Sequence, residues 1–171
     1  MSVQGVTDFL IENSSLARDI NKDVTHIQDL FINLQDKYEL KDSERDALQH
    51  LYGSSYIKEK HGHYSSLLSG MWHEVEGVSH GQKPEHLFAD VLNNLKGLNV
   101  KIPTSEMVSV LQKLSDNKMT EIDHQNLKKY IGLGLEIAAP VPETEAYPDN
   151  YSKSKKEPEQ SIIRQLINLG Q

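Results

Sequence analysis

The chain contains no cysteine among its 171 residues, and this absence excludes several kinds of protein at once. Without thiols there is no disulfide scaffold, thiolate zinc site, iron–sulfur cluster or cysteine nucleophile. A chain of 19.4 kDa does not need such cross-links, because it can bury well over half of its surface on folding. We therefore expect about one domain that is held together by an ordinary hydrophobic core.

Positive charge and long apolar runs are also scarce. The formal net charge is −7, the mean hydropathy is −0.56, and aromatic residues make up 6% of the chain. No apolar run approaches the roughly 18 residues of a membrane-spanning helix, and an acidic chain repels phosphate backbones. We expect neither a membrane nor a nucleic acid as partner. The first 17 residues lack lysine and arginine, which predicts a cytoplasmic protein or one exported without a cleaved signal.

The strongest pattern that is present is an apolar stripe along the first forty residues. Alternate steps of three and four lead from Val3 to Tyr38 and meet one polar residue, Asn13. This spacing returns to one helix face, as in a coiled coil or a helical bundle. Because Asn and Ser favour helix caps, the run Asn13-Ser14-Ser15 allows either one long helix or two, over 3–12 and 15–39.

The stripe permits two interpretations. It is either the core of a bundle, covered by the chain's own helices, or an exposed face for self-assembly or a partner. Both require the same residues, so the pattern alone does not choose between them. The stripe residues that we expect to contact a partner are Ile20, Val24, Ile27, Phe31, Leu34 and Tyr38.

Shorter amphipathic helices should follow. One should begin at Asp42 or Ser43, where either side chain can cap free amides, and should end near Gly62. The next carries apolar residues at helical spacing and should end in a loop between Gly77 and Gly81. We expect its inward face to consist of Tyr64, Leu67, Leu68, Met71, Trp72 and Val75.

Proline and glycine suggest the limits of the following helix. Pro84 suits its first turn, and Gly97 suits the position just after its end. We expect its apolar face to be buried. That face consists of Leu87, Phe88, Val91, Leu92 and Leu95.

Two more helices should complete the bundle. Thr104 can cap the first of them, and Thr120 with Asp123 matches a capping box that opens the second. The run Gly132-Leu133-Gly134 is typical of a helix stop. The sequence thus predicts an all-α helical bundle over residues 1–137, with a long coiled-coil-like helix at its N-terminus.

The composition changes after residue 137. Four prolines stand among charged and small polar residues, which predicts a flexible linker over residues 138–160. Residues 161–171 then repeat apolar positions on one face of a short helix, which is marginal in water by itself. This docking helix should bind its own bundle or a partner's groove, or else stay unfolded. Its apolar residues are Ile162, Ile163, Leu166, Ile167 and Leu169.

Five of the eight histidines fall between residues 61 and 86, with carboxylates among them. Imidazole and carboxylate together bind zinc, nickel or copper. His73-Glu74 begins like a metalloprotease motif, but residue 77 is glycine where that motif requires histidine. We therefore expect surface histidines and no cofactor. The candidate ligands for a metal site or a pH sensor, the alternative, are His61, His63, His73, His80 and His86.

Sequence patterns of catalysis are missing. There is no phosphate-binding P-loop, no dinucleotide-binding glycine pattern and no nucleophile elbow. We expect a non-enzymatic module for protein–protein interaction or self-association through apolar helix faces, such as an adaptor, a chaperone-like protein, or a secreted or phage accessory protein. The alternative is a small metal-dependent enzyme or a metal- or pH-responsive protein that uses the histidines from His61 to His86.

Overall fold

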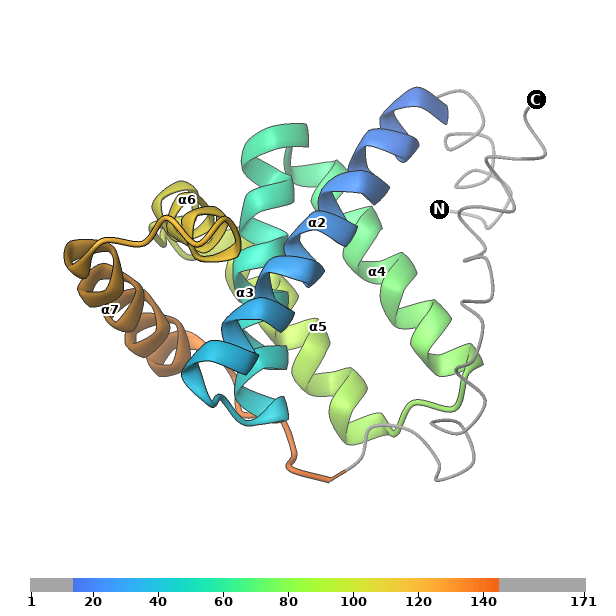
Figure 1. Ribbon diagram of the computed structural model, residues 1–171. Coiled ribbons are helices and arrows are strands. Elements are labelled where there is room, and N and C mark those ends of the chain that lie inside the picture. Colours follow the sequence, from blue (N-terminus) through green and yellow to red (C-terminus); the bar gives the residue numbers. More distant parts are fainter. Residues whose placement is uncertain (1–13, 145–171) are drawn as a thin grey trace.

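The computed structural model describes residues 14–144, and this part of the chain is helical without strands (Figure 1). The expectation of an all-α protein is therefore confirmed. None of the described helices is long and apolar enough to cross a membrane. The helices are α2 (Ser14–Tyr38), α3 (Asp42–His61), α4 (His63–Ser79), α5 (Pro84–Asn99), α6 (Thr104–Ser115) and α7 (Glu121–Ile137).

Three sequence predictions concern residues outside this range. They are the part of the apolar stripe before Ser14, most of the linker predicted over 138–160, and the docking helix over 161–171 with Ile162, Ile163, Leu166, Ile167 and Leu169. The following description refers to residues 14–144 alone.

Helix α3 is the centre of the fold and packs against each of the other five described helices. It runs parallel to α5, since its His50 contacts Asn94 and its Lys58 contacts the carbonyl of Leu98. Helix α4 returns antiparallel to α3 after the turn at Gly62, whose φ of 90° suits glycine. Helix α4 therefore lies on the side of α3 away from α6 and α7 (Figure 1).

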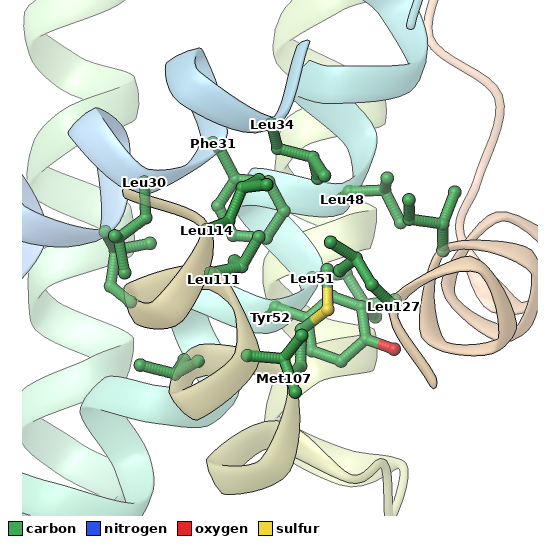
Figure 2. Packing of buried hydrophobic residues seen from close by; sticks show 14 of the residues in the cluster. Leu30, Phe31, Leu34, Leu48, Leu51, Tyr52, Met107, Leu111, Leu114 and Leu127 are labelled. Atoms are coloured by element: carbon green, nitrogen blue, oxygen red, sulfur yellow. The ribbon is translucent and has the colours of Figure 1, made fainter. Parts of the chain in front are cut away.

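The main hydrophobic core lies among α2, α3, α6 and α7 (Figure 2). Phe31 of α2 stacks on Tyr52 of α3 with ring centroids 6.4 Å apart, and the Tyr52 hydroxyl donates to the carbonyl of Tyr130 at 2.8 Å. This hydrogen bond offsets the free-energy cost of burying the Tyr52 hydroxyl. Met107 and Leu111 of α6 and Leu127 of α7 fill the other side of this core. Helices α4 and α5 supply none of its buried residues.

The middle of the apolar stripe belongs to this core. Ile27, Phe31 and Leu34 are buried against α3 and α6 of the same chain, so in this fold they are closed to a partner. Ile20, Val24 and Tyr38 are half-buried. Of the two interpretations of the stripe, coverage by the chain's own helices describes the segment from Ile27 to Leu34.

Three glycines that the sequence suggested as helix ends lie inside helices. Helix α4 continues through Gly77, α5 through Gly97 and α7 through Gly134. At Gly97 an added Cβ would lie 2.1 Å from the Leu51 carbonyl oxygen. These predictions were wrong, because the pattern that marks a helix end also marks close packing of two helices.

The cap predictions had mixed outcomes. Thr120 and Asp123 form the expected capping box, with Thr120 Oγ1 accepting from the Asp123 amide at 3.2 Å. Thr104 does not cap α6. Its buried hydroxyl instead donates to Ser55 Oγ at 2.7 Å and ties α6 to α3.

The packed part of the chain also extends beyond residue 137, where we expected the bundle to end. Ala139 and Val141 are buried, although they belong to the predicted linker. The buried Asn93 side chain donates to the Ala139 carbonyl at 3.1 Å and accepts from the Ala139 amide at 2.6 Å. This paired backbone anchors the segment on α5.

Candidate functional site

Helices α4 and α5 are inverted relative to the sequence prediction. More than half of the apolar residues that we expected inside lie outside, with Met71 58%, Val75 56% and Phe88 65% exposed. The remaining residues of these faces are half-buried: Leu67, Leu68, Trp72, Leu87 and Leu92. The buried positions are largely polar or small instead. The prediction of inward apolar faces was therefore wrong for Tyr64, Met71, Val75, Phe88, Val91 and Leu95, all of which are exposed.

The exposed apolar residues line a groove of about 500 Å³ between the two helices. We call it the α4–α5 groove. The solvent-facing part of its wall consists of Met71, Val75 and Val78 on α4, with Val91 and Leu95 on α5. Contiguous apolar surface of this kind is uncommon on soluble monomers unless something binds there.

Next to the groove lies a set of buried and half-buried polar residues from α3, α4 and α5, which we call the His50 cluster. Its members are Asp46, His50, Glu74, Asp90 and Asn94. Glu74 and Asn94 also line the groove, so the cluster and the groove share a boundary. The site thus combines an apolar surface with a charged interior.

A network of hydrogen bonds fixes the orientation of Asn94. Its amide nitrogen donates to Glu74 Oε1 at 2.9 Å, and its carbonyl oxygen accepts from Ser54 Oγ at 2.7 Å. The same oxygen lies 3.2 Å from His50 Nδ1. Because this oxygen can only accept, His50 Nδ1 carries the hydrogen, and Nε2 faces the other way.

Two carboxylates face His50 Nε2. The nitrogen lies 3.6 Å from Asp90 Oδ1 and 3.8 Å from Asp46 Oδ1. Both distances are too long for a hydrogen bond. Asp90 Oδ1 is buried without a hydrogen-bond partner, as is Glu74 Oε2. Buried polar atoms normally have partners, so these oxygens are exceptions that require an explanation.

Burial and like charge shift the pKa values of the cluster. Burial raises the pKa of Glu74 to about 7 and the pKa of Asp90 to about 6, while His50 acts in the opposite direction on both. Burial alone would lower the pKa of His50, but the carboxylates of Asp90, Asp46 and Glu74 outweigh it and raise the value. The raised carboxyl pKa values show that negative charge on Glu74 and Asp90 is costly in this buried place.

The five histidines that were the candidate ligands of the alternative metal site do not gather in one place. His61 lies 2.6 Å from an Asp23 oxygen, His63 is exposed, and His80 contacts its own helix through the Glu76 carbonyl. His86 is buried near Thr144. Only His73 approaches the cluster, with its ring centroid 5.7 Å from that of His50.

His50 and Asp46 were not among the site residues predicted from the sequence. Both precede the histidine-rich segment, and their place on α3 gave no sign of which helix would face them. Their spacing of four residues, which Asp90 and Asn94 share, puts each pair on one helix face. That spacing is the signal that could have identified them. Within residues 14–144, Asp46, His50 and Asp90 are the group whose possible ligand atoms all lie within 4.8 Å of one another.

Comparison with known proteins found no family model, no curated protein and no solved structure that matches this chain. The function is therefore argued from the geometry of the site.

Proposed function

We propose that this chain is a non-enzymatic protein-interaction module whose α4–α5 groove holds an amphipathic helix of a partner protein. The observation that carries the proposal is the inversion of α4 and α5, which places apolar residues at helical spacing on the surface. Two such faces side by side offer a concave apolar surface, the geometry by which a groove receives a helix.

The length of the groove sets the size of the occupant. On α5 the lining residues run from Leu87 to Leu98, which is about 16 Å at 1.5 Å per residue. A helix of about three turns covers that length. It should present apolar anchors at i, i+3 or i+4 and i+7, because these positions share one face.

The charge around the groove favours a neutral or basic occupant. Helices α4 and α5 contain four carboxylates and one lysine, Lys96, which already donates to the Ile137 carbonyl. Glu74 lines the groove with one oxygen that has no hydrogen-bond partner. A lysine or arginine on the partner helix would complement this charge and increase the association rate.

The first test uses the full chain and a labelled synthetic helix as the probe. The probe carries leucines on one face and lysines on its flanks, and a matched probe carries glutamates in place of the lysines. Fluorescence anisotropy should show binding of the lysine probe, with binding of the glutamate probe weaker by about tenfold or more. Val75→Asp and Leu95→Asp should abolish binding, since each places a charge on the apolar wall.

Ile122→Asp is the matched control, because Ile122 is 68% exposed on α7 and lies outside the groove. It should leave probe binding unchanged. Failure of the full chain to bind either probe, or equal loss of binding in Ile122→Asp, would contradict the proposal. Far-UV circular dichroism checks that each variant keeps its helices.

Two other occupants are distinguishable in the same experiment. If the probe binds only after Ile163→Asp and Leu166→Asp, the chain's own C-terminal segment occupies the groove instead of a partner. If light scattering finds a dimer that Val75→Asp dissociates, a second copy occupies it. Either result replaces the partner helix in the proposal. With a partner helix as occupant, the isolated chain should be a monomer of 19.4 kDa.

A further inference from the structure

We infer that Asp46, His50 and Asp90 form a binding site for a first-row divalent transition-metal ion such as zinc, independent of the α4–α5 groove. The three residues come from two parallel helices, α3 and α5, and their side chains converge on one point. Three features of these residues point to a metal ion: the convergence of acceptor atoms, the spacing of those atoms, and the bonds that hold them.

The first observation is that three acceptor atoms converge when His50 is neutral and both aspartates are ionised. In the neutral ring, His50 Nδ1 donates to the Asn94 carbonyl oxygen, so the lone pair of Nε2 points toward Asp46 and Asp90. Asp90 is 3% exposed, and its Oδ1 has no hydrogen-bond partner. Converging lone pairs in a buried place repel one another unless a cation lies between them.

The second observation is the spacing of these atoms. Zinc binds imidazole nitrogen and carboxylate oxygen at about 2.0–2.2 Å, so two ligands at a tetrahedral angle lie about 3.4 Å apart. The distances of 3.6 Å and 3.8 Å from Nε2 to the two carboxylates are close to that value. The imidazole favours zinc and its neighbours over magnesium and calcium, which prefer oxygen ligands alone.

The third observation is that other side chains hydrogen-bond to the proposed ligands and fix their orientation. His50 is oriented by Asn94, which is itself fixed by Ser54 and Glu74. The second oxygen of Asp90 accepts from Gln82 Nε2 at 2.7 Å. Such outer contacts set the tautomer and direction of metal ligands.

Other charged groups also surround the site. Arg45 Nη2 lies 3.6 Å from the Asp46 oxygen, Glu74 Oε1 lies 3.7 Å from His50 Nδ1, and the His73 ring is near His50. Asp46 is a quarter exposed, so it provides the way in from solvent. When they are ionised, the Asp46 and Asp90 ligands carry two negative charges that a dication would neutralise, even beside Arg45.

The test uses the full chain, with any tag removed, after dialysis against EDTA. Competition with a chromophoric chelator measures zinc binding, and cobalt(II) absorption reports the ligand geometry. We expect one ion per chain, bands of cobalt in a tetrahedral or five-coordinate site, and no competition from magnesium or calcium. His50→Gln and Asp90→Asn should each weaken zinc binding by about 100-fold or more, because the loss of an outer-shell partner alone costs 10–100-fold.

The controls are His63→Gln and Glu85→Gln, since both residues are exposed and Glu85 shares α5 with Asp90. Zinc binding of these variants should stay within about twofold of the unchanged chain. Asp90→Asn removes a buried charge, so in EDTA its melting temperature should equal or exceed that of the unchanged chain. Zinc should raise the melting temperature of the unchanged chain but not that of Asp90→Asn. This combination separates a lost ligand from a lost fold.

Three outcomes would overturn the inference. The first is that the chain binds no zinc, cobalt or manganese in molar excess. The second is that both His50→Gln and Asp90→Asn still bind zinc like the unchanged chain. The third is that His63→Gln abolishes binding. A cluster that exchanges protons alone would give the first of these outcomes.

Discussion

Two glycines in this chain allow neighbouring helices to pack closely, because they have no Cβ. Gly97 lets α5 come against the backbone of α3 at Leu51, and Gly134 lets α7 lie on Leu48 and Tyr52. Gly132, two residues before Gly134 on the same helix, has nothing within 4 Å of the place where a Cβ would be. One residue type therefore has opposite consequences at neighbouring positions.

This contrast gives a prediction. Gly97→Ala should lower the free energy of unfolding by about 2 kcal/mol or more, because the Leu51 carbonyl cannot move aside without shifting the α3 backbone. Gly132→Ala should instead raise the free energy of unfolding by about 0.5–1 kcal/mol, since alanine has a higher helix propensity than glycine at an exposed position. Urea unfolding followed by circular dichroism measures both. Equal effects of the two substitutions would contradict the close packing at Gly97.

Side chains of the His50 cluster also carry stability at the residue scale. Asn94 connects three helices, because it bonds with Glu74 on α4 and with Ser54 on α3 while it belongs to α5. Bonds of this kind attach α4 and α5 to α3, together with small apolar contacts such as that of Ala47 with Ala89. Buried networks of this kind stabilise a single arrangement when every member is satisfied, and the unpartnered oxygens of Glu74 and Asp90 are the exceptions here.

At the scale of elements, the fold consists of two parts with different packing. Helices α2, α3, α6 and α7 bury apolar faces, as their sequence patterns predict. Helices α4 and α5 attach to α3 through polar and small residues and turn their apolar faces outward. The inversion is the feature from which both proposals come, since it creates the groove outside and the cluster inside.

The segment after α7 provides an element-scale prediction. Asn93 is fully buried and pairs with both the amide and the carbonyl of Ala139. Asn93→Ala should leave two buried backbone groups without partners and lower the free energy of unfolding by about 2 kcal/mol. It should also release residues 138–144, so limited proteolysis should cut there first.

Asn99→Ala is the matched control for this prediction, because Asn99 is exposed and donates only to Leu95 of its own helix. Its unfolding free energy should change by no more than about 0.5 kcal/mol. If Asn93→Ala is as stable and as resistant to proteolysis as Asn99→Ala, the anchoring role of Asn93 is wrong.

At the scale of the whole molecule, the raised pKa values of the cluster link stability to pH. A carboxyl group whose pKa rises on folding does not destabilise the fold below its unfolded pKa. Its destabilising effect grows as pH rises from the unfolded to the folded pKa and is constant above that. For Glu74 this window extends from 4.5 to about 7. His50 acts in the same direction, because a raised histidine pKa contributes stability at low pH that is lost as pH rises.

The chain, measured in EDTA, should therefore be less stable at about pH 8 than at about pH 5, with Glu74 contributing up to about 3 kcal/mol of the difference. Glu74→Gln should reduce the pH dependence by the share of Glu74 and leave the shares of Asp90 and His50, while Glu85→Gln, on the exposed surface, should leave it unchanged. Urea unfolding at the two pH values measures the effect. Equal stability at both, or an unchanged slope in Glu74→Gln, would contradict it.

Much of the fold could be predicted from the sequence by itself. Helical periodicity gave the class, and local chemistry gave several helix limits, such as the break at Gly62, the start at Pro84 and the capping box at Thr120. These features depend on residues near each other in the chain, whose preferences are visible in any short window.

The candidate site could not be predicted in the same way. Periodicity shows that α4 and α5 each have an apolar and a polar face, but the choice of which face meets α3 depends on what α3 offers. There, His50 and Ser54 hydrogen-bond with Asn94, and the Leu51 carbonyl requires a glycine opposite it. Only the tertiary structure decided this, because the partners of a buried polar group lie on other helices, where a local pattern carries no information.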